Sequence, residues 1–172
     1  MDADRAAGAQ RSDRTRYLAA HARLALASSD LDRYRTVKLI EPLKRNLANK
    51  KNLMQTTLTG FTEAAAYQVA DVTTQATFLI GELYADFSRA LMQSERPRNL
   101  NAEELEQYDI LLEEQAYPFE EKAIEVHETN TQRIASGVYD HWTRRSMASL
   151  AVLMPVRYAK QEEGESFVAV LQ

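Results

Sequence analysis

Hydrophobic residues recur every three to four positions through most of this chain, which is the spacing of one face of an α-helix. The clearest case lies within residues 61–97 and predicts a long amphipathic helix ending near Ser94, with Asp71 as the residue that caps its start. Its apolar positions are Val72, Ala76, Leu79, Ile80, Leu83, Phe87, Ala90 and Leu91. We expect this helix to have neighbours on both sides.

Two helices are predicted before it. Residues 13–27 form a short amphipathic segment closed by Ser28 and Ser29, and Asp30 is the expected N-cap of a longer helix over residues 31–67. Apolar residues recur at seven-residue steps in that longer run and predict a seam along one side. The seam consists of Ile40, Leu47, Met54 and Phe61. Pro42 lies inside the run, so a kink or break is expected at residues 40–42.

The second half of the chain contains clearer signals for the ends of helices. Residues 95–101 read ERPRNLN and predict a loop, with Asn101 capping the following helix. That helix is expected to end at Pro118, and a new one to run from about residue 119 to Gly137. A last helix over residues 138–154 is ended by Pro155, with Trp142, Met147, Leu150 and Leu153 facing inward.

The composition supports an all-α fold, which we expect to contain about five to seven helices. Only 5 Gly and 4 Pro interrupt 172 residues, while Ala, Leu, Glu, Gln and Arg are frequent. The length predicts one domain. We assign it to residues 13–160, between a lead-in at residues 1–12 and a tail at residues 161–172. An apolar patch at residues 167–171 is expected either to dock or to fray.

The net charge of −4 disfavours binding to nucleic acid. The chain has no Cys, which excludes disulfides and thiolate zinc sites but fits either a reducing cytoplasm or an envelope compartment. No window reaches the ~20 apolar residues of a membrane span. The polar start lacks the apolar core of a secretory signal, and it would also suit a fragment of a longer protein.

The ionisable residues do not assemble a catalytic or metal-binding motif. A di-iron helical bundle needs Glu-x-x-His, but Ile124 precedes His127 by three residues and Val138 precedes His141 by three. The third histidine, His21, lies far away in sequence. There is no G-x-S-x-G turn and no glycine-rich phosphate loop. We therefore predict no catalytic residue, cofactor or metal.

The numerous carboxylates are expected to form solvated helix faces, although their density alone would allow an acid/base role. They are Glu103, Glu104, Glu106, Glu113, Glu114, Glu120, Glu121, Glu125 and Glu128. The aromatic residues are expected to fill the spaces between helices, a ligand-binding wall being the alternative. They are Tyr67, Tyr84, Tyr108, Tyr117, Tyr139 and Trp142.

Two basic clusters are expected to be solvated faces or to meet an acidic partner. The first contains Lys44, Arg45, Lys50 and Lys51. The second contains Arg144, Arg145, Arg157 and Lys160, and its alternative role is to balance the neighbouring glutamates.

The helix-and-turn pattern resembles the tetratricopeptide-repeat family. In the phrase ATFLIGELY, Ile80, Gly81 and Tyr84 stand where the family has leucine, glycine and tyrosine, and Gly81 would allow close approach of a neighbouring helix. Segments closing at Pro118 and Pro155 lie 37 residues apart, near the family's period of roughly 34. The resemblance implies antiparallel helix pairs in a degenerate solenoid. The lengthened turn and the larger residues of the second helices depart from the pattern.

More narrowly, three phrases resemble the C-terminal part of large tetratricopeptide-repeat proteins of the Gram-negative bacterial envelope. These are TTQATFLIGELYADFSRALMQSERP, LEQYDILLEEQAYPFEEKAIEVHETN and GVYDHW. The resemblance implies a non-catalytic scaffold that binds protein partners on the periplasmic side. The alternatives are a cytoplasmic location, a homo-oligomer formed through the 40/47/54/61 seam, and, third, a helical-bundle enzyme or metal protein.

Overall fold

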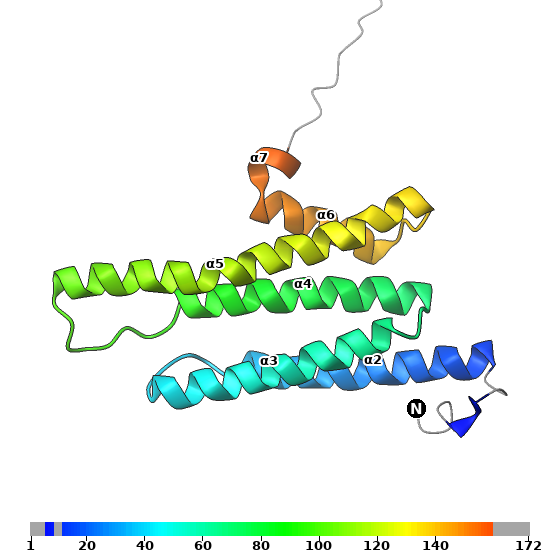
Figure 1. Ribbon diagram of the computed structural model, residues 1–172, viewed down its shortest axis with the longest axis horizontal. Coiled ribbons are helices and arrows are strands. Elements are labelled where there is room, and N and C mark those ends of the chain that lie inside the picture. The colour runs from blue at the N-terminus through cyan, green and yellow to red at the C-terminus, as the bar shows by residue number, and fades with distance from the viewer. Residues whose placement is uncertain (1–5, 9–11, 160–172) are drawn as a thin grey trace, which may run out of the picture.

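The computed structural model describes residues 6–8 and 12–159, and helices joined by loops make up this described part, with no strand in it. The helices follow one another as an array of antiparallel rods (Figure 1). They are α2 (Asp13–Thr36), α3 (Leu43–Ala65), α4 (Ala70–Met92), α5 (Ala102–Gln132), the 3-10 helix η2 (Arg133–Ser136), α6 (His141–Leu153) and α7 (Pro155–Tyr158). The predicted all-α class is confirmed. None of these helices combines the length and apolarity required to cross a bilayer.

Helix α4 lies at the centre of the array. It contacts α2 and α3 on one side and α5 and α6 on the other. Its buried face carries Val72, Ala76, Leu83, Phe87 and Leu91, which join the main hydrophobic core. The periodic pattern along residues 61–97 therefore located the central helix and its inward face correctly.

Helix α2 is longer than predicted, because it continues through Ser28 and Asp30 to Thr36. The Ser28 hydroxyl donates to the carbonyl of Leu24 (2.9 Å), so the serine is accommodated inside the helix rather than ending it. Leu31 and Tyr34 continue the buried stripe beyond this point. Packing of that stripe outweighs the weak helix preference of Ser and Asp.

The chain breaks at residues 37–42, as Pro42 predicted, and α3 begins after Pro42 as its N-cap residue. Within α3, Met54 and Phe61 are buried in the core that α3 shares with α2 and α4. Ile40 lies in the break and is exposed. The predicted seam is therefore divided: Met54 and Phe61 pack within the chain, and Ile40 lies outside the helix.

Helix α5 runs without interruption through Pro118, so the prediction that it ends there is wrong. Pro118 is exposed, while Ala116 and Ala123 on the opposite face are buried. The carbonyl that loses its hydrogen bond to the proline therefore faces water, which lowers the cost of the interruption. Figure 1 shows that α5 changes direction near its middle. Pro155 does follow the end of a helix, since α6 ends at Leu153.

Several local boundaries match the sequence. Asn101 caps α5: its Oδ1 accepts from the Glu104 amide (3.0 Å), and Glu104 Oε2 accepts from the Asn101 amide (2.9 Å). Gly137 has φ +83°, in the left-handed region where glycine is favoured, and it follows η2. In contrast, α4 starts after Val69 without a side-chain cap, and Asp71 lies in its first turn.

Helix α6 also differs from the helix predicted over residues 138–154. It starts at His141, not residue 138, because Asp140 is its N-cap and accepts from the amides of Trp142 and Thr143 (both 2.9 Å). Leu150 is buried as expected, but Met147 is exposed. The predicted lead-in at residues 1–12 and the tail patch at 167–171 lie mostly or wholly outside the described residues.

Candidate functional site

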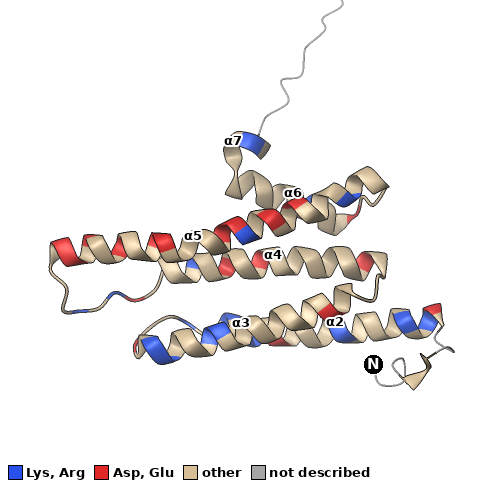
Figure 2. Cartoon of the chain, in the orientation of Figure 1, with Lys and Arg blue, Asp and Glu red and all other residues tan. Residues whose placement is uncertain are grey.

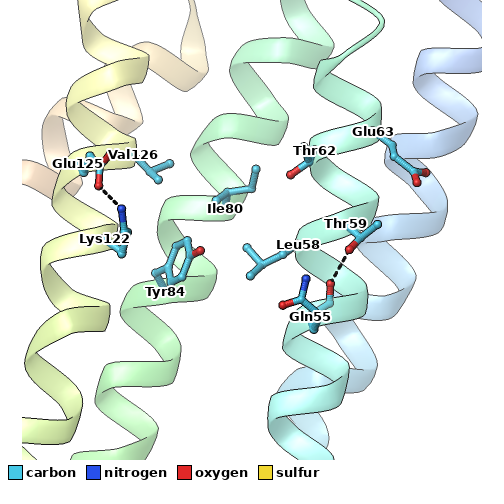
Figure 3. A pocket seen from close by; sticks show the side chains of 10 residues that line it. All are labelled: Gln55, Leu58, Thr59, Thr62, Glu63, Ile80, Tyr84, Lys122, Glu125 and Val126. Carbon is cyan, nitrogen blue, oxygen red and sulfur yellow. Dashed lines mark hydrogen bonds and ion pairs between the residues drawn. The ribbon is translucent and has the colours of Figure 1, made fainter.

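A groove of about 530 Å³ opens over α4 between α3 and α5 (Figure 3). Side chains from all three helices line it. They are Gln55, Leu58, Thr59, Thr62 and Glu63 from α3, Ile80 and Tyr84 from α4, and Lys122, Glu125 and Val126 from α5. The size lies within the ~300–1,000 Å³ typical of ligand pockets.

Helical spacing explains why each helix contributes these residues. Ile80 and Tyr84 are four positions apart on α4, as are Leu58 and Thr62 on α3, and residues at this spacing share a face. Ile80, Tyr84 and Leu58 are partly buried and packed against the core. With Val126 they give the groove an apolar part, while the remaining lining residues are polar or charged.

The charges of the groove are already paired. Arg23 of α2 donates to Glu63 (Nε to Oε2, 2.6 Å), and Lys122 donates to Glu125 (Nζ to Oε2, 2.6 Å). The pairing with Glu125 raises the pKa of Lys122. No unpaired acid or base is thus concentrated at the apolar part of the groove.

The charged residues are unevenly distributed among the helices. Figure 2 shows acidic residues spread along α5, whereas Lys and Arg are frequent on α2 and α3. Most of the glutamates predicted to face water are exposed, including Glu103, Glu113 and Glu121. Within the groove itself the charged lining residues are Glu63 on α3 and Lys122 and Glu125 on α5.

A second set of polar residues lies in the interior, where α4, α5 and α6 meet. His127 Nδ1 lies 3.3 Å from Ser146 Oγ, and His127 Nε2 lies 3.5 Å from Glu82 Oε1. The second distance is long for a hydrogen bond, so we regard it as an electrostatic contact. Asn130 Nδ2 donates both to Ser146 Oγ (2.9 Å) and to the carbonyl of Thr74 (3.1 Å).

The contacts from Ser146 to His127 and from His127 to Glu82 resemble those of a hydrolytic triad. Their surroundings differ from those of an active site. His127 and Ser146 are both 0% exposed, and the Ser146 hydroxyl already accepts a hydrogen bond from Asn130. The contact with His127, followed by the hydrogen bond from Ser149 Oγ (2.7 Å), holds the pKa of Glu82 below its ordinary value against the effect of burial.

Gly81 of α4 lies directly against the His127 ring. A Cβ atom at Gly81 would lie 2.6 Å from both Cε1 and Nε2 of His127, far closer than van der Waals contact. The predicted close approach of a neighbouring helix at Gly81 is therefore confirmed, and the neighbour is α5.

The three histidines occupy separate environments. His21 Nε2 on α2 lies 3.3 Å from Asp71 Oδ2, His127 is in the core, and His141 is exposed at the start of α6. Over residues 6–8 and 12–159, no group of three or more His, Asp or Glu side chains is arranged to hold a metal ion. Glu128, near His127 in sequence, instead accepts from Arg157 Nη1 (2.9 Å) and the Tyr158 hydroxyl (2.6 Å), which ties α7 to α5.

The aromatic and basic candidates are dispersed. Trp142 packs on Phe78 with ring centroids 5.5 Å apart, and the Arg145 guanidinium lies 4.3 Å from the Phe78 centroid. Tyr139 is exposed, so it does not extend this contact into a wall. Lys160 lies outside the described residues.

The expectation of a solvated face fails at one member of the first basic cluster. Lys50 is buried, whereas Lys44, Arg45 and Lys51 are exposed.

Sequence reasoning identified Tyr84 and Gly81 but did not identify the groove or the polar core. Both combine residues from three helices that are far apart in the chain, and no local motif joins them. Comparison with known proteins adds no assignment: no protein-family model matches the chain, and no significant match is found among curated proteins or solved structures.

Proposed function

We propose that this chain is a non-catalytic protein-interaction module that holds a segment of a partner protein in the groove over α4. The observation that carries the proposal is the meeting of Leu58, Ile80, Tyr84 and Val126 in a groove of about 530 Å³ that is open to solvent. Grooves with an apolar part and a polar rim bind amphipathic helices or extended peptides in other proteins.

The proposed architecture is a degenerate tetratricopeptide-like array of helix pairs. Support comes from the contacts: besides neighbours in sequence, α4 touches both α2 and α6, as alternate helices do in stacked pairs. These three helices begin at Asp13, Ala70 and His141, intervals well above the family's period of roughly 34 residues. The proposed array is therefore built from unusually long helices.

The proposed setting is a scaffold within a bacterial envelope assembly, a location that rests on the sequence resemblance alone. The alternative, a homo-oligomer through the 40/47/54/61 seam, is less favoured because Met54 and Phe61 are buried inside the chain. Sedimentation equilibrium distinguishes the two: a concentration-dependent dimer that is lost on replacement of exposed Ile40 by Glu would support the seam.

The groove is tested by a matched pair of substitutions on α3. Thr59 and Thr56 are both exposed, and each hydroxyl donates to the carbonyl four residues earlier (3.0 and 3.1 Å). Thr59 lines the groove and Thr56 does not. Thr59→Trp should block the groove without changing the core, whereas Thr56→Trp adds the same bulk elsewhere on the helix.

The measurement is capture of proteins from Gram-negative envelope extracts, with the same column load for wild type and both variants. We expect a partner that wild type and Thr56→Trp retain and that Thr59→Trp loses, while all three share the same melting temperature. A partner retained equally by Thr59→Trp, or no reproducible partner for wild type, would count against the groove as the binding site.

A further inference from the structure

A second pocket, of about 290 Å³, lies where the end of α2 meets α3 and the end of α4. Its polar lining consists mainly of Tyr34, Arg35, Lys50, Asp86 and Arg89. Three of these side chains are cationic and one is a carboxylate, so the pocket carries surplus positive charge. It is distinct from the groove over α4, with which it shares no lining residue.

Lys50 is the most unusual member, because it is only 4% exposed. Its Nζ donates to the carbonyls of Tyr34 (3.2 Å) and Val37 (2.8 Å), and it lies 3.9 Å from the centroid of the Tyr34 ring. An ammonium group has three N–H donors. Two of them stabilise the end of α2, where the helix dipole favours a cation, and one remains. Burial lowers the pKa of Lys50.

Tyr34 provides an unused donor. The residue is fully buried, and its hydroxyl has no hydrogen-bond partner. Burial raises the pKa of this hydroxyl, and the nearby Asp86 carboxylate raises it further. An unpaired buried hydroxyl lowers the stability of the folded protein. A ligand that accepts its hydrogen bond would remove that cost.

The two arginines share one carboxylate. Arg35 Nε lies 3.3 Å from Asp86 Oδ2, and Arg89 Nη1 lies 2.7 Å from Asp86 Oδ1. Each guanidinium has five N–H groups, so most remain available in the planar arrangement that suits phosphate and carboxylate oxygens. Asp86 neutralises only one of the three cations and orients the two guanidinium groups.

We propose that this pocket binds a small oxyanion, a phosphate or carboxylate group, between Lys50, the Tyr34 hydroxyl and the guanidinium groups of Arg35 and Arg89. A water molecule could satisfy the hydroxyl, but it would not balance the surplus charge. An oxyanion does both, and its several oxygens can accept from donors on three helices at once. Binding would fasten the ends of α2, α3 and α4 together.

The test measures the melting temperature and the calorimetric binding of the whole chain with inorganic phosphate or acetate, at constant ionic strength set with sodium chloride. Arg89→Gln removes one guanidinium, and Tyr34→Phe removes the hydroxyl while leaving the ring in place. Arg98→Gln is the matched control, because Arg98 is an exposed arginine that does not line the pocket.

We expect phosphate or acetate to bind and raise the melting temperature of wild type and Arg98→Gln, and each pocket variant to bind about ten- to a hundredfold more weakly, the range expected for loss of a hydrogen bond to a charged group. Binding of phosphate alone would identify a phosphate site, and binding of acetate would identify a site for carboxylates. No effect beyond that of chloride, or equal losses in Arg98→Gln and Arg89→Gln, would overturn the proposal. Thr59→Trp should leave this binding unchanged, so failure here is separable from failure of the groove.

Discussion

Replacing Gly81 by alanine tests the packing of α4 against α5 with one added carbon atom. The new Cβ would lie 2.6 Å from two atoms of the His127 ring and 2.9 Å from a third. Carbon atoms in optimal contact lie ~3.5–4.0 Å apart, so the ring or a helix must move by about 1 Å. His127 is completely buried and contacts Ser146, which leaves the ring little room to move.

Two effects of opposite sign determine the magnitude. Alanine in a helix interior is favoured over glycine by about 0.8–1.0 kcal/mol. Overpacking a well-filled core typically costs about 1–3 kcal/mol. We therefore expect Gly81→Ala to destabilise the protein by about 0–2 kcal/mol, which lowers the melting temperature by up to about 8 °C for a chain of this size. Gly81→Leu, with three more carbons, should destabilise it further.

The assay is thermal and urea unfolding followed by helical circular dichroism, applied to a double-mutant cycle. His127→Ala removes the ring that meets the new methyl group, at the cost of a cavity and a lost contact with Ser146. If the clash is with His127, Gly81→Ala should be harmless or stabilising in the His127→Ala background. The coupling between the two sites is then expected to be about 1–3 kcal/mol.

Two results would refute this reasoning. A rise in the melting temperature of Gly81→Ala in the otherwise wild-type chain would mean that helix propensity dominates and the approach of α5 is loose. Strictly additive effects of Gly81→Ala and His127→Ala would mean that the methyl group meets something other than the ring.

Two further predictions concern α4 and α5. Because the pKa of Glu82 is held below its ordinary value of 4.5 in the folded protein, its stabilising contribution is present above about pH 4.5 and is lost as the pH falls through its folded pKa. The melting temperature of wild type should therefore fall more steeply between pH 6 and pH 3 than that of Glu82→Gln. These limits lie about 1.5 units on either side of the ordinary pKa of the carboxyl group. Parallel curves would contradict the prediction. Pro118→Ala restores an amide donor for the Glu114 carbonyl and should raise the melting temperature by several degrees, since an interior proline costs up to about 3 kcal/mol. A lower melting temperature would show that the bend in α5 is needed for packing.

The polar core also has a consequence for how the helices associate. Asn130 and His127 of α5 are directed to partners on both α4 and α6, namely the Thr74 carbonyl, Glu82 and Ser146. A shift of α5 by one turn would leave these buried groups without partners, which is costly. The network therefore favours one register of α5 between its two neighbours.

Local signals in the sequence were reliable where the determining atoms lie within a few residues. Asn101 caps α5 as the sequence predicted, with Glu104 completing a reciprocal cap, and Pro42 ends helical structure as expected. The same local rules failed at Ser28 and Pro118. In both cases a buried stripe on the opposite face of the helix continues past the residue and outweighs its local preference.

Burial of polar residues could not be inferred in this way. Lys50 belongs to a run of basic residues that predicts a solvated face, yet its ammonium group lies over Tyr34 and binds carbonyls 13 and 16 residues earlier in the chain. His127 sits among glutamates that face water, but it points toward α4 and α6. Periodicity gives the direction of a side chain and not the identity of the group that it meets.

The sequence by itself determined the helical class, the central position of α4, the close approach at Gly81 and several helix ends, because these depend on periodicity, backbone geometry and contacts between near neighbours. Only the tertiary structure decided the continuity of α2 and α5, the polar core around His127, the groove over α4 and the cationic pocket beside Tyr34. Each of these joins side chains from three helices or balances a local preference against burial. Their energies therefore depend on how the helices pack, which no segment of the chain specifies alone.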